Sequence, residues 1–64
     1  MKRYAIELNA RFVADTDNVK TAEKQFSRFR EHFPEPNNMI RVWDRETGAT
    51  YKGFPLNEEN EEID

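Results

Sequence analysis

The chain has no cysteine and only one histidine, one serine and two glycines among its 64 residues. The lack of cysteine excludes a disulfide-stapled scaffold, and with a single histidine no zinc site is expected. Ser27 and His32 lie five apart in a predicted helix, about 140° out of phase, so they form no nucleophile–base pair. We therefore expect no metal, no cofactor and no enzymatic activity.

Long apolar runs are also missing. Glu7, Asn9 and Arg11 interrupt the residues that follow the basic N-terminus, which predicts no signal peptide. No stretch approaches the roughly 20 apolar residues of a membrane span. We expect a cytoplasmic protein.

Charge is distributed unevenly along the chain. Residues 1–54 carry ten basic and eight acidic side chains, whereas residues 55–64 carry five acidic ones and no basic one. The sequence therefore predicts a single domain over residues 1–55, followed by an acidic, flexible C-terminal tail over residues 56–64.

Two hydrophobic periods follow one another in the first half of the chain. Apolar residues occupy even positions from Tyr4 to Phe12, which predicts one strand over about residues 3–13. Apolar residues then recur at spacings of three and four, predicting an amphipathic helix over about 17–33. The members of that stripe are Val19, Ala22, Phe26, Phe29 and Phe33. Asp15, Thr16 or Asp17 is expected to cap the helix, and Pro34 to end it.

Residues 39–54 read as a β-hairpin around Gly48, with strands near 39–44 and 49–54. A loop over 45–48 pairs Val42 with Tyr51, whereas a loop over 46–48 pairs Trp43 with Tyr51. The first register gives the cleaner core, because it keeps Lys52 off the helix side.

The segment Ile-Arg-Val-Trp-Asp-Arg-Glu-Thr-Gly, residues 40–48, resembles the last hairpin of a WD40 propeller blade. A propeller needs several blades of about 40 residues each, so the resemblance supports the hairpin and not the propeller fold.

Together these elements predict an α+β fold of order β-α-β-β, one helix on a three-stranded, mainly antiparallel sheet. The preferred strand order is 1-3-2, with the strand at 49–54 in the middle, because every neighbouring pair is then antiparallel. The alternative places the first two strands side by side in parallel.

The sheet face away from the helix is the candidate binding surface. If Ile40 and Val42 face the helix, that outer face gathers one aromatic and several basic side chains: Trp43, Arg41, Arg11, Arg3 and Lys52. Tryptophan and arginine are enriched where proteins bind each other, and basic residues beside an aromatic also suit single-stranded nucleic acids. The remaining alternative is a Trp43–Tyr51 pair that covers the sheet without a ligand.

A second basic feature is a stripe at i, i+4 and i+8 of the helix, formed by Lys20, Lys24 and Arg28. It is a solvated helix face, a phosphate contact or a dock for the acidic tail.

We expect a small non-enzymatic regulator or inhibitor that binds another protein, of a kind that suits a phage or mobile element. The alternative is RNA or single-stranded DNA binding through the basic and aromatic sheet face. A homodimer through the unpaired edge of the long first strand is also expected.

Overall fold

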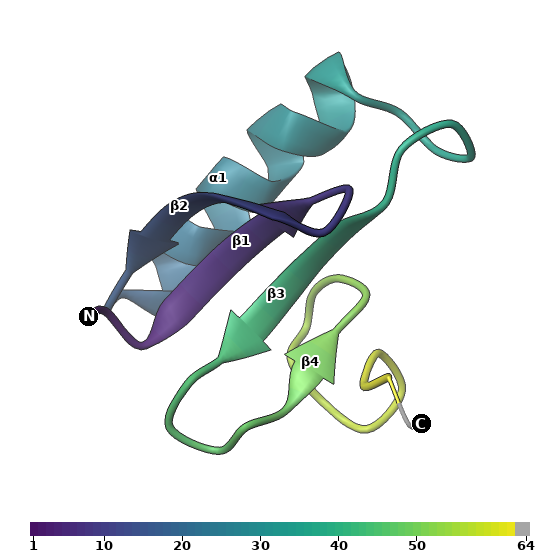
Figure 1. Ribbon diagram of the computed structural model, residues 1–64. Helices are drawn as coiled ribbons and strands as arrows, with labels where there is room; N and C mark the ends of the chain where they lie inside the picture. Colours follow the sequence, from purple (N-terminus) through teal and green to yellow (C-terminus); the bar gives the residue numbers. More distant parts are fainter. Residues whose placement is uncertain (63–64) are drawn as a thin grey trace.

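The computed structural model describes residues 1–62, which form one helix and one four-stranded sheet (Figure 1). In chain order these are β1 (Tyr4–Leu8), β2 (Arg11–Thr16), α1 (Val19–His32), β3 (Ile40–Asp44) and β4 (Thr50–Tyr51). The strands lie in the order β2-β1-β3-β4, every neighbouring pair is antiparallel, and α1 packs on one face. The predicted α+β class, with one helix on an antiparallel sheet, is confirmed.

The expected single strand over 3–13 is instead the hairpin β1–β2. The chain reverses at Asn9 and Ala10, which both have positive φ, 53° and 67°. Leu8 pairs with Arg11 across this turn, and the β1–β2 register shifts between Ile6 and Glu7. The alternation of apolar residues continues through the turn, so the pattern by itself does not reveal the reversal.

This reversal also changes the middle of the sheet. Because β2 brings the chain back before α1 begins, β3 can run antiparallel to β1 without a parallel crossover. The all-antiparallel pairing that favoured the order 1-3-2 is present, but the strand beside β1 is 40–44, and residues 50–51 pair with β3.

The N-cap of α1 is Asn18, one residue after the last of the three expected caps, Asp15, Thr16 and Asp17. The side chain of Asn18 accepts hydrogen bonds from the backbone N–H groups of Lys20 and Thr21, at 2.9 and 3.1 Å. Asp17 accepts from the Arg3 N–H, and Thr16 accepts from the Asn18 N–H. The neighbouring polar residues therefore fix the approach to the helix, and Asn18 caps it.

The core lies between α1 and the central strands. Ile6, Ile40 and Val42 are fully buried, and Phe26 of α1 is only 5% exposed. The ends of the apolar stripe reach beyond the sheet, since Val19 and Phe33 are 44% and 40% exposed.

The second hairpin has the expected loop over residues 45–48. Val42 pairs with Tyr51 and Trp43 with Thr50, which confirms the preferred register. Gly48 has a φ of 79°, and its N–H donates to the Asp44 carbonyl oxygen at 2.8 Å. Tyr51 therefore packs against the core and does not pair with Trp43.

The acidic C-terminal segment follows β4 and returns alongside it (Figure 1, yellow). Glu61 forms an antiparallel bridge with Tyr51, and Leu56 packs against the core. The flexibility expected for residues 56–64 stays a prediction, while the contacts of residues 56–62 favour an ordered position beside β4. Residues 63 and 64 lie outside the described residues.

Within residues 1–62 no helix is both long enough and apolar enough to cross a lipid bilayer.

Candidate functional site on the helix-free face of the sheet

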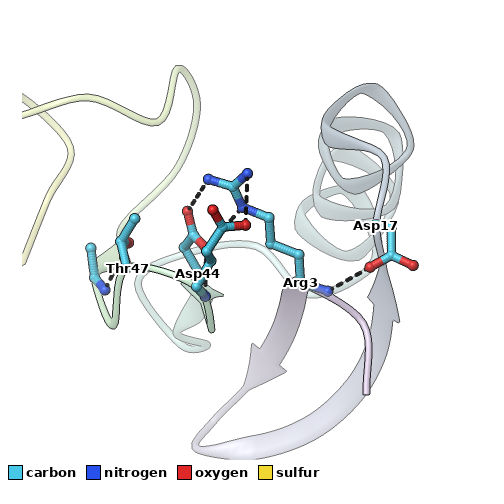
Figure 2. A network of polar contacts seen from close by, with 6 residues as sticks. Arg3, Asp17, Asp44 and Thr47 are labelled. Carbon is cyan, nitrogen blue, oxygen red and sulfur yellow. Dashed lines mark hydrogen bonds and ion pairs between the residues drawn. The ribbon is translucent and has the colours of Figure 1, made fainter.

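An ion-pair network joins the start of β1 to the end of β3 (Figure 2). The Arg3 guanidinium donates from Nε and Nη2 to the two carboxylate oxygens of Asp44, each at 3.1 Å. Arg3 also forms an ion pair with Glu46 at 3.2 Å, and its backbone N–H donates to Asp17 at 2.9 Å. Both carboxylate oxygens of Asp44 therefore accept a hydrogen bond from the same guanidinium. This bidentate pair fixes where the 45–48 loop leaves the sheet.

Asp44 is the buried member of this network, with only 4% of its surface exposed. The hydrogen bond from Arg3 holds the pKa of the Asp44 carboxyl below its usual value, against the opposing effect of burial. The Glu46 N–H also donates to Asp44 at 3.0 Å. Asp44 is therefore a charged anchor of the hairpin loop.

The anchored loop places Arg45 over the helix-free face. The Arg45 N–H donates to the Arg3 carbonyl oxygen at 2.8 Å, which ties the loop to the start of β1. Its guanidinium carbon lies 5.5 Å from the Phe12 ring centroid and 5.6 Å from the Trp43 ring centroid. Both distances are within the range of cation–π attraction. We call Phe12, Arg45 and Trp43 the stacked cluster.

Polar contacts hold the same guanidinium in place. Arg45 Nη1 donates to the Lys2 carbonyl oxygen at 2.8 Å and to Asp15 at 3.2 Å. Its Nε is buried without a hydrogen-bond partner among the described residues. The side chain is only 17% exposed, so the cation is largely removed from water.

Beneath the stacked cluster lies Ala5, which is fully buried although no helix covers this face. Its neighbours in the sheet are Asp15 on β2 and Trp43 on β3. Because Arg45 reaches from the loop after β3 to Asp15 on β2, it must cross the sheet near Ala5. Trp43 and Phe12 remain 39% and 56% exposed at its sides. The result is an apolar surface with a stacked cation in it.

The basic residues predicted for this face have different positions. Arg41 lies opposite Glu7 and forms an ion pair with Glu62, leaving its side chain 18% exposed. Arg11 pairs with Leu8 in the hairpin register and is exposed.

Arg3 and Lys52 are also set apart from the stacked cluster. Arg3 is held by Asp44, and Lys52 is exposed after β4. Of the predicted set, the structure therefore brings only Trp43 into the stacked cluster.

Two residues of the cluster escape the sequence-based reasoning. A single strand over 3–13 places Phe12 on the helix side with Leu8, but the turn and the register shift place it opposite Glu7 instead. Arg45 reads only as a loop residue. The available signal was Asn9, because asparagine tolerates the left-handed conformation of a two-residue turn better than most residues.

The predicted stripe on α1 is present as an exposed surface. Lys20, Lys24 and Arg28 all lie on the solvent side of the helix. Among residues 1–62 none of the three forms an ion pair, in contrast to Arg3, Arg41 and Arg45.

Over the described part of the chain there is no pocket and no cluster of three side chains suited to a metal ion. Comparison of the chain with protein-family models, with curated proteins and with solved structures gives no match.

Proposed function

We propose that the protein is a small non-enzymatic regulator that binds another protein through the stacked cluster. The observation that carries the proposal is the exposure of Trp43 and Phe12 on either side of a largely desolvated arginine. A few residues supply most of the binding energy of a protein interface, and these residues are enriched in tryptophan and arginine and cluster where packing is tight.

Rigidity supports this choice. Arg45 is held by two hydrogen bonds and two ring contacts, and the loop that carries it is tied to Arg3 and Asp44. A partner therefore meets an ordered surface and orders few further side chains on binding. That reduces the entropic cost of association.

Charge favours protein over nucleic acid at this face. Arg3, Arg41 and Arg45 are each paired with an acidic side chain. A phosphate backbone would have to compete with those carboxylates for each of these three guanidinium groups, and affinity for nucleic acid comes mainly from cations that are free to replace counterions.

The test is affinity capture from a lysate of the cells that encode the protein, with and without nuclease. Wild type is compared with Trp43→Ala and with Phe33→Ala, since Phe33 is 40% exposed and lies at the end of α1, away from the cluster. We expect a protein partner that nuclease treatment does not release. The free energy of binding this partner should become about 2 kcal/mol or more less favourable in Trp43→Ala, a typical hot-spot effect.

Phe33→Ala should bind the partner as wild type does. Circular dichroism and a melting curve must show that Trp43→Ala is folded. If the folded Trp43→Ala variant captures the same partner with the same affinity, the stacked cluster is not the binding surface.

The second candidate function is nucleic-acid binding, and the stripe on α1 is the surface that favours it. Lys20, Lys24 and Arg28 are exposed and unpaired within residues 1–62. If this function holds, nuclease should abolish capture. Lys24→Ala should then reduce the slope of log K against log salt by about one.

Homodimerisation also remains a proposal, but the unpaired strand edge it requires is now that of β2 and not that of β1. β1 is paired on both sides, so the free edge of the segment expected as one strand belongs to β2. The shift in its register opposes regular pairing with a second copy.

A further inference from the structure

We propose that the edge of β4, together with Arg41, is a binding site for an extended acidic segment of a partner protein. Residues 60–62 occupy this site in cis, and the partner replaces them. The inference rests on the proposed protein-binding function for the class of partner only, because the site itself is separate from the stacked cluster.

Residues 60–62 bind as an added strand. The Lys52 N–H donates to the Asn60 carbonyl oxygen at 2.7 Å, and the Glu62 N–H donates to the Thr50 carbonyl oxygen at 2.8 Å. Tyr51 and Glu61 form the bridge between these two bonds. Main-chain pairing of this kind is how sheet edges recognise extended peptides.

Arg41 gives the site its charge preference. It lies on β3, next to β4 in the sheet, and its Nε donates to the Glu62 carboxylate. Arg41 Nη1 also donates to the Ile40 carbonyl oxygen at 3.0 Å, which orients the guanidinium. A peptide that keeps the backbone bonds and presents a carboxylate at the position of Glu62 would make the same contacts.

The segment that occupies the site makes few contacts that would oppose its replacement. Residues 57–62 contain no apolar side chain, so their contact with β4 buries little hydrophobic surface. The Glu62 side chain remains 34% exposed. What favours the cis segment is its tether, which gives it a high effective concentration at the edge.

The experiment uses the full chain and a fluorescein-labelled peptide with the sequence of residues 58–64, Glu-Glu-Asn-Glu-Glu-Ile-Asp. Glu62→Arg places two cations together at positions 41 and 62 and so releases the cis segment. By anisotropy, Glu62→Arg should bind the peptide on the order of tenfold more tightly than wild type, the change expected if the cis segment occupies the site about nine-tenths of the time.

Charge reversal identifies the site. Arg41→Glu should not bind this peptide, but it should bind the same peptide carrying Arg at the position of Glu62. Arg41→Gln serves in place of Arg41→Glu if the latter does not fold, and in the Glu62→Arg background it should weaken binding of the original peptide. Lys24→Glu on α1 distinguishes the edge from the helix stripe.

Equal binding of the peptide by wild type and Glu62→Arg would overturn the proposal. Loss of binding in Lys24→Glu combined with Glu62→Arg would also do so, because it would assign the peptide to the helix. Trp43→Ala tests the proposed function at the stacked cluster, so each proposal can fail without the other.

Discussion

On the face covered by α1, Ile6, Ile40 and Val42 are buried among aliphatic and aromatic neighbours, whereas on the opposite face Ala5 is buried between Asp15 and Trp43, where Arg45 lies against two rings. The covered face depends on apolar area that a helix removes from water. The open face has no such layer, and a guanidinium held by Asp15 and two rings takes its place. A small sheet can therefore bury Ala5 on its open side and still leave the aromatic side chains of Trp43 and Phe12 exposed.

The largest effect is expected from damage to the covered face. Phe26 is 5% exposed and meets Phe54 edge to face, with ring centroids 5.6 Å apart. Gly53 approaches the same ring so closely that a Cβ there would lie 3.4 Å from it. Phe26→Ala should destabilise the fold by about 3–5 kcal/mol, enough to unfold much of so small a domain.

A urea titration followed by circular dichroism measures this loss, with Phe33→Ala as the matched control because Phe33 is 40% exposed. A Phe26→Ala variant as stable as wild type is incompatible with α1 packing on the sheet.

A smaller effect is expected from damage to the open face. Arg45→Ala removes two cation–π contacts, which together contribute about 1–2 kcal/mol at partly exposed sites. It also removes the ion pair with Asp15. Urea denaturation should show this loss, and quenching of Trp43 fluorescence by the neutral quencher acrylamide should increase, because the Arg45 side chain no longer lies against the ring.

Arg45→Lys separates the contribution of the charge from that of the planar group, because lysine keeps the charge but cannot lie flat against the rings. It should recover only part of the stability. If Arg45→Ala melts at the wild-type temperature, the open face does not depend on the stacked cluster.

The smallest effect concerns the Arg3–Asp44 network, which joins the start of β1 to the end of β3. The pKa of Asp44 is lower in the folded chain, chiefly because of the Arg3 hydrogen bond, so the unfolded chain binds its proton more readily. This contribution is fully present above the unfolded pKa of about 4 and is lost as the pH falls through the lower folded value. Because the Arg3 side chain is 37% exposed, solvent screens part of the interaction.

Melting temperatures measured from pH 7 to pH 2 should therefore fall in wild type more than in Asp44→Asn. Parallel curves for the two proteins would show that Asp44 does not contribute to the acid sensitivity.

Several features were predictable from local sequence. The 3- and 4-residue spacing of Ala22, Phe26 and Phe29 defined α1, because a stripe on one side of a helix packs in only one orientation. Gly48 and the alternation around Val42 defined the second hairpin and its register, since a one-residue slip would move every side chain to the other face. The helix stripe and the hairpin register both depend on residues that are close together in sequence.

The first hairpin was decided by contacts distant in sequence. Ala10 has no intrinsic preference for a φ of 67°, and the turn is held from across the sheet. The Asn9 N–H donates to the Met39 carbonyl oxygen at 2.7 Å, and the Asn9 side chain accepts from the Met39 N–H at 2.9 Å. Asn9 and Met39 are 30 residues apart, so no local sequence pattern predicts these hydrogen bonds.

The candidate binding surface also depends on the chain reversal at Asn9 and Ala10. The sequence determined that Trp43 lies on a strand with its side chain opposite to Val42, because adjacent residues of a strand point to opposite faces. Which side chains lie beside Trp43 depends on contacts between strands that are far apart in sequence. The reversal at Asn9 and the shifted register carry Phe12 to the open face, and the Arg3–Asp44 pair directs Arg45 between β2 and β3. Periodicity states which side of its own strand a residue takes, whereas the pairing of strands decides which residues meet.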